Sequence, residues 1–133
     1  MIGIDTNVLV RLVTRDDPLQ TSQAEHLLDT AGREGLFVNL VVLAELSWVL
    51  RRAYRFEAAT VLEAIEGVLE GREFVVERAS IARMALDNAR RVRCGFADAL
   101  IDCINNEAGV RETVTFDIKA KRLPTMRDLA AGS

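Results

Sequence analysis

Two acidic side chains stand where a carboxylate is hard to place. Asp5 ends the apolar segment 2–4, and Asp is depleted from strands because a carboxylate there needs a partner. Glu45 lies inside the apolar segment 36–50, on an otherwise apolar helical face. A carboxylate on such a face is costly to bury unless it is paired with a base or bound to a metal ion. The plain alternatives are that Asp5 caps the following helix and that Glu45 pairs with Arg52 or another arginine.

Two further acids, Asp98 and Asp117, stand at positions of interest in the second half of the chain. Asp98 falls in the first turn of an expected helix, where the helix dipole favours an anion, and Asp117 directly follows an expected strand. Stabilisation of a helix N-terminus would account for either of them alone. Asp102 lies one turn after Asp98 on the same helical face. Its role stays open between support of a site and ordinary solvation.

Taken together, these acids predict a cluster of oxygen donors. Thr6, Asn7 and Thr115 stand close to them in the sequence and add hydroxyl and amide groups. Like-charged carboxylates that lie close together repel, so either some of them are protonated or a cation sits among them. Hard oxygen ligands without His or Cys suit Mg²⁺ or Mn²⁺. Such an ion can activate water and offset charge on a phosphoryl oxygen, which fits hydrolysis of a phosphodiester bond.

The histidine and cysteine counts argue against other mechanisms. The chain has one histidine, His26, and two cysteines, Cys94 and Cys103, which are too few for a zinc site of His and Cys ligands. A single histidine among polar neighbours also argues against a Ser-His-Asp triad. We expect His26 to face solvent, Cys103 to be buried and Cys94 to be a loop thiol. The chemistry then depends on carboxylates, amides, hydroxyls and basic side chains.

Length and composition predict one globular domain over residues 1–133. The chain has 133 residues, 50% of them hydrophobic, and a net charge of -3. The longest uncharged apolar stretch, residues 36–44, is far shorter than the roughly 18 residues that a membrane span needs. The acid at position 5 argues against a secretory signal. We therefore expect a cytoplasmic protein without a membrane segment, whose first residues already belong to the fold.

Short β-type runs alternate with amphipathic segments along the chain. Strands are expected at residues 2–5, 36–38, 73–76, 113–116 and 123–126. Helices are expected at residues 7–14, 18–31, 40–52, 57–70, 79–92 and 96–108, with a short helix or turn at 117–122. This order predicts an α/β fold with a mostly parallel central sheet and helices on both faces. The ligand site of such a sheet lies at the carboxyl ends of its strands, where Asp5 and Asp117 are expected.

Four sequence blocks follow one another in a familiar order. They are IDTNVLVRL at the start, VVLAELSWVL in the middle, then FADALIDCI and finally TVTFDIKAKRL. Together they cover essentially the whole chain, which resembles the PIN-domain ribonucleases and, among them, the VapC-type toxins of toxin–antitoxin pairs. The resemblance implies a PIN-like three-layer sandwich. It also implies an endoribonuclease that depends on Mg²⁺ or Mn²⁺ and is neutralised by a cognate antitoxin protein.

The resemblance also implies roles for individual residues. Asp5, Glu45, Asp98 and Asp117 match the four acids of the family, which act as catalytic and metal-binding residues. Asn7 and Thr115 match positions that assist the metal or its water, whereas Thr6 and Asp102 are supporting candidates outside the firm pattern. RNA is the implied substrate, and a homodimer is a common state of such toxins.

Two other functions remain open at this point. An aspartate-dependent phosphoryl-transfer domain would also use an Asp at a strand end, although Asn7 stands where such domains carry a second acid. A non-catalytic PIN-like module for protein binding would keep the fold but would not need all four acids. Trapping of a phospho-aspartate would favour the former, and lack of Mn²⁺ affinity would favour the latter.

Overall fold

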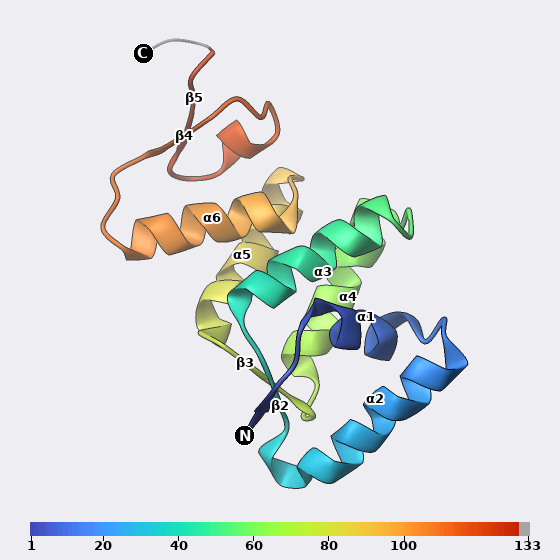
Figure 1. Ribbon diagram of the computed structural model, residues 1–133. Helices are drawn as coiled ribbons and strands as arrows, with labels where there is room; N and C mark the ends of the chain where they lie inside the picture. Colours follow the sequence, from blue (N-terminus) through green and yellow to red (C-terminus); the bar gives the residue numbers. More distant parts are fainter. Residues whose placement is uncertain (131–133) are drawn as a thin grey trace. The chain divides into compact units, whose positions relative to one another are not determined.

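The computed structural model describes residues 1–130 (Figure 1). The chain divides into two compact units, one over Met1–Ala79 and a second that begins at Ser80. The expectation of a single domain over residues 1–133 stays a prediction. Within the described residues, none of the helices is both long enough and apolar enough to cross a bilayer.

A three-stranded parallel sheet lies in the first unit. Its strands are β1 (Ile2–Gly3), β2 (Leu36–Val38) and β3 (Phe74–Val76), in the order β1-β2-β3. Ile2 pairs with Leu36, which in turn pairs with Phe74. Parallel neighbours need long crossover connections, and helices supply them here. The strands are short, and the first stops at Gly3 rather than at residue 5, because Asp5 already caps the following helix.

Three helices of the first unit, α1 (Thr6–Thr14), α2 (Pro18–Ala31) and α3 (Leu40–Arg52), begin at a side chain that caps them. The others are the short 3-10 helix η1 (Gly32–Glu34) and α4 (Ala58–Glu70). The Asp17 carboxylate accepts a hydrogen bond from the Gln20 amide at 3.0 Å, with Pro18 as the first helical residue. Asn39 caps α3 in the same way. Each cap satisfies an amide that has no partner inside its helix.

The core of the first unit is aliphatic. Leu9 of α1, Leu36 of β2, Leu43 and Leu46 of α3 and Ile65 of α4 are completely buried. α1 packs against α2 and α3, and α3 packs against α4. Full burial of each such side chain stabilises the fold by about 1.5–3 kcal/mol relative to leaving it in water. These helices therefore hold the ends of α1 and α3 in fixed positions.

The second unit contains two helices and a pair of parallel strands. Its elements are α5 (Ala79–Val92), α6 (Phe96–Glu107), β4 (Thr113–Thr115), the 3-10 helix η2 (Ala120–Arg122) and β5 (Met126–Asp128). Thr113 pairs with Met126, so all strand pairs of the described residues are parallel, as predicted. They form two sheets, β1-β2-β3 and β4-β5.

The last strand lies farther along the chain than residues 123–126, where it was expected. Leu123 is buried, and its amide donates to the Ala120 carbonyl, so it closes η2 instead of beginning a strand. Pro124 has no amide proton for a ladder. Strand pairing therefore begins only at Met126.

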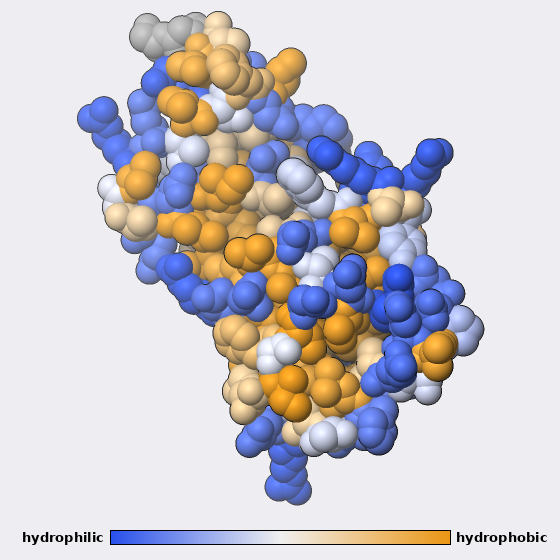
Figure 2. All heavy atoms as spheres, in the orientation of Figure 1, coloured by the Kyte–Doolittle hydropathy of each residue, from blue (hydrophilic) through white to orange (hydrophobic). Residues whose placement is uncertain are grey.

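Some apolar side chains remain at the surface. Figure 2 shows hydrophobic atoms interspersed among hydrophilic ones on the face in view. Val41 and Trp48 of α3 are 67% and 56% exposed. Both lie on the face of α3 that carries Glu45, so this face is exposed rather than buried.

Candidate active site

Asp5 is the N-cap residue of α1. It lies two residues after β1, and its Oδ1 accepts a hydrogen bond from the Val8 amide at 3.3 Å. The capping role considered from the sequence is therefore present. A carboxylate has two oxygens and about four lone-pair sites, so one weak cap leaves capacity for a cation. Asn7 lies two residues later, exposed in the first turn of α1.

Glu45 is bound by a threonine from another helix. The Thr6 hydroxyl at the start of α1 donates to Glu45 Oε1 on α3 at 2.8 Å. These residues lie 39 positions apart in the sequence. The bond orients Glu45 relative to the N-terminus of α1, where Asp5 lies.

Glu45 does not carry the cost of burial that its apolar neighbours in the sequence raise as a question. Glu45 is exposed, so its carboxylate keeps water and has no large desolvation cost to offset. The Arg52 guanidinium does not pair with it among the described residues. Instead Arg52 lies over the Trp48 ring, 4.6 Å from the ring centroid, as a cation–π contact.

Polar side chains follow all three strands of the first sheet. Asp5 follows β1, Asn39 follows β2 and Glu77 follows β3. Asn39 Oδ1 accepts from an amide in the first turn of α3 at 2.8 Å, and Glu77 Oε1 accepts from the Leu40 amide at 2.9 Å. The sequence analysis missed Glu77, although an acid directly after a strand was the signal that singled out Asp5 and Asp117. Together these caps fix the N-terminus of α3, the helix that carries Glu45.

Asp98 and Asp117 interact with each other in the second unit. Burial in the first turn of α6 raises the pKa of Asp98, and the negative charge of Asp117 raises it further. Asp117 is exposed, and its Oδ1 accepts from the amides of Lys119 at 2.7 Å and Ala120 at 3.1 Å. The Asp117 amide donates to Thr115 Oγ1 at 3.0 Å. Thr115 thus supports the turn that presents Asp117.

Asp102 is buried and hydrogen-bonded within the second unit. Only 2% of it is exposed, which excludes the solvated alternative. Its Oδ1 accepts from the Thr125 amide at 3.3 Å and also from the Thr125 hydroxyl. These bonds tie α6 to the segment before β5. The structure therefore gives Asp102 a role in holding the second unit together.

Comparison with known proteins now decides the family. The PIN domain family model matches residues 2–125. The chain belongs to the PIN domain family. It is also similar to a VapC ribonuclease of Aquifex aeolicus (strain VF5), with 26% identity over 122 residues that cover 90% of each chain. The family resemblance and the α/β fold class expected from the sequence are confirmed.

The two cysteines of this PIN domain are buried thiols with raised pKa values. Cys94 is buried and donates to the Gly95 carbonyl at 3.5 Å. Burial, and then the charge of Asp98, raise its pKa to about 11, so the nucleophilic thiolate is scarce at neutral pH. Cys103 is buried, as predicted, and burial raises its pKa as well. His26 is exposed on α2, which is also as predicted.

The oxygen donors of this PIN domain fit a hard divalent cation. Within either unit, the described residues hold no group of three or more His, Cys, Asp or Glu side chains that could bind a metal ion. In the second unit, burial raises the pKa of Asp98, and the negative charge of Asp117 nearby raises it further. Oxygen-only donors of this kind suit Mg²⁺ or Mn²⁺. The convergence of this pair with Asp5 and Glu45 of the first unit stays a prediction.

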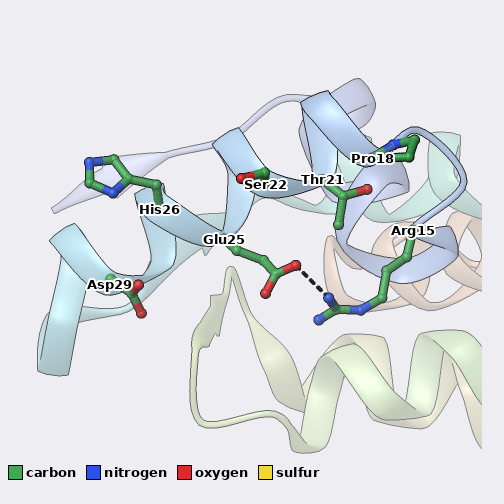
Figure 3. Close-up of a pocket in the computed structure, with 7 residues that line it drawn as sticks. All are labelled: Arg15, Pro18, Thr21, Ser22, Glu25, His26 and Asp29. Atoms are coloured by element: carbon green, nitrogen blue, oxygen red, sulfur yellow. Dashed lines mark hydrogen bonds and ion pairs between the residues drawn. The ribbon is translucent and has the colours of Figure 1, made fainter.

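A shallow hollow of about 510 Å³ lies along α2, and none of the candidate acids lines it (Figure 3). Its lining residues are Arg15, Pro18, Thr21, Ser22, Glu25, His26 and Asp29. Glu25 pairs with Arg15 at 2.7 Å, whereas His26 points away from that ion pair. Its side chains do not converge on one point, so the hollow is not the candidate site.

Proposed function

We propose that this PIN domain is a VapC-type endoribonuclease, a toxin that hydrolyses phosphodiester bonds of RNA and is neutralised by a cognate antitoxin. The similarity to a VapC ribonuclease over 90% of both chains supports this activity. That similarity is the observation that carries the proposal, and the effect of the Asp117 charge on Asp98, two residues that come from separate elements of the second unit, fits a cation site there. We also propose that the protein acts in the cytoplasm, where it meets its RNA substrate. A homodimer is a further part of the proposal.

The four acids have distinct roles in the proposed site. Asp5, Asp98 and Asp117 would hold Mg²⁺ or Mn²⁺, directly or through water. When bound, the ion supplies a Lewis acid for the phosphoryl group and lowers the pKa of coordinated water. Glu45 completes the set or orients the attacking water through Oε2, since its Oε1 already accepts from Thr6. The Thr115 hydroxyl and the amides of the turn after Asp117 hold the Asp117 carboxylate in its orientation.

Membership of the PIN domain family excludes the phosphoryl-transfer alternative considered from the sequence. A non-catalytic PIN module remains the opposite outcome of the test below. That module would need no metal and would be unaffected by removal of the acids.

The test is cleavage of total RNA by the purified protein in Mg²⁺ or Mn²⁺. We expect defined fragments, which EDTA abolishes and renewed Mn²⁺ restores. Asp5→Asn keeps an oxygen for the α1 cap but removes the charge, so cleavage should fall about 100-fold or more because several kcal/mol of electrostatic stabilisation are lost. Gel mapping of the RNA fragments over time measures the cleavage rate of each protein. Wild-type rates from Asp5→Asn, or from protein in EDTA, would contradict the proposal.

Thr6 offers a second, independent test of the site. Thr6→Val keeps the shape of the side chain but removes the donor to Glu45 Oε1. Loss of such an orienting partner typically costs about 10–100-fold, so we expect kcat for RNA cleavage to fall by roughly 10-fold. Thr6→Ser retains the hydroxyl and should restore most of the rate. Equal rates for the Val and Ser variants would show that the hydrogen bond has no part in catalysis.

A further inference from the structure

The guanidinium of Arg122 binds two backbone carbonyls of the second unit. Nη2 donates to the Arg93 carbonyl at 3.1 Å, and Nε donates to the Lys119 carbonyl at 3.3 Å. Arg122 ends η2, whereas Arg93 lies 29 positions earlier, between α5 and α6. Arginine presents its donors in a rigid planar fork, so one side chain can hold two acceptors at a fixed separation. Arg122 thus connects two segments that are distant in the sequence.

The first of these segments is the turn that presents Asp117. The Lys119 amide donates to Asp117 Oδ1 at 2.7 Å, and the carbonyl of the same residue accepts from Arg122 Nε. The Ala120 amide also binds Asp117 Oδ1. Arg122 therefore holds the same short turn that the Asp117 carboxylate closes. A movement of this turn would carry the Asp117 carboxylate with it.

The second segment leads directly into the helix that carries Asp98. Arg93 has a φ of 58°, in the left-handed region that side chains other than glycine adopt only at a cost. Gly95 is the N-cap residue of α6, and Asp98 lies in its first turn. The hydrogen bond from Arg122 anchors the Arg93 carbonyl in this strained turn. It therefore also helps to fix where α6 begins.

The negative charges of Asp98 and Asp117 repel each other, so a bond that links their segments opposes this repulsion. We propose that Arg122 is a positioning residue that holds the Asp98 and Asp117 segments together and thereby sets the affinity of this acid pair for a divalent cation. The inference rests on the proposed function, in which these two acids help to bind the ion. In this role the Arg122 guanidinium binds two backbone carbonyls and does not bind a phosphate of the substrate.

The experiment compares Arg122→Gln with Lys121→Gln, because both remove one positive charge from adjacent positions. Among the described residues, the Lys121 side chain forms an ion pair with Asp128, with Nζ 3.5 Å from the carboxylate, and it makes no bond to the Arg93 segment. We expect Mn²⁺ affinity, measured by electron paramagnetic resonance titration of the full chain, to fall about 10–100-fold in Arg122→Gln, as for other residues that orient metal ligands. Lys121→Gln should stay within about 3-fold of wild type, since a surface charge contributes little.

Arg122→Lys separates geometry from charge and also serves if the Gln variant does not fold. Lysine keeps the charge but cannot make both bonds of the fork, so we expect a clear loss of Mn²⁺ affinity in folded protein, with folding checked by circular dichroism. Wild-type affinity in Arg122→Lys, or equal losses in Arg122→Gln and Lys121→Gln, would overturn the inference while leaving the proposed function intact. A wild-type chain that binds no Mn²⁺ would overturn both.

Discussion

Asp98→Asn is expected to remove RNA cleavage and, at the same time, to stabilise the metal-free protein at neutral pH. Both effects come from the same environment. Asp98 is half-buried in the first turn of α6 and near the charge of Asp117. In the proposed site its charge is needed to hold the cation. Its loss should lower cleavage about 100-fold or more, since several kcal/mol of charge stabilisation are removed.

The gain in stability has a defined pH dependence. Burial and Asp117 raise the pKa of Asp98 in the folded chain above its unfolded value. The contribution of this group is then fully present in acid, below the ordinary Asp pKa of about 3.9, and is lost as the pH rises through the folded value. At neutral pH the ionised Asp98 therefore destabilises the fold. Asparagine, which cannot ionise, avoids that cost.

Thermal unfolding in EDTA from acid to neutral pH measures this difference. Asp98→Asn should unfold at the wild-type temperature in acid and at a higher temperature near pH 7. Asp87→Asn is the matched control, because Asp87 is exposed on α5 and should change neither cleavage nor stability. A variant that loses cleavage but is less stable than wild type at pH 7 would contradict the electrostatic argument.

Asp102→Ala is expected to give the largest loss of stability among the candidate acids. Its carboxylate is buried and accepts from both the amide and the hydroxyl of Thr125. Alanine would leave these donors without a partner, at a cost of about 1–3 kcal/mol each when buried, and we expect a total of roughly 3 kcal/mol. Urea unfolding of the metal-free protein measures this cost.

The controls for Asp102 separate structure from catalysis. Asp87→Ala should stay within about 0.5 kcal/mol of wild type, because it removes an exposed acid. Asp102→Asn keeps an acceptor for Thr125 and should lose less stability than the alanine variant. If the folded Asp102→Asn protein cleaves RNA as fast as wild type, the residue is structural. A loss of cleavage as large as that of Asp98→Asn would instead place Asp102 in the active site.

The sequence by itself determined the order and the boundaries of most elements, because the signals that set them are local. The predicted helix over residues 79–92 is α5, and Asp17 and Asn39 cap α2 and α3 by accepting from amides in the first turn of each helix. A side chain caps the turn next to it, and helical spacing of apolar residues acts over a few residues. Where a local signal was weak, at the strand after Pro124, the prediction was displaced.

The four acids were also found from the sequence, from their position after strands or in apolar surroundings and from the family resemblance. The environments of these acids, in contrast, could not be predicted from the sequence. The spacing of apolar residues could not tell whether the Glu45 face of α3 meets the core, because apolar residues stand on several faces of this helix. Only the tertiary structure showed that α3 exposes that face and that Thr6 binds this acid.

Contacts between distant segments likewise came only from the tertiary structure. The burial of Asp102 against Thr125, the cap that Glu77 provides for α3 and the fork of Arg122 each join residues 23 or more positions apart. No local pattern encodes such pairs, because each depends on how whole helices and turns pack. The chain's own residue order thus determined which groups are available for chemistry, and packing decided which of them are buried, paired or held in place.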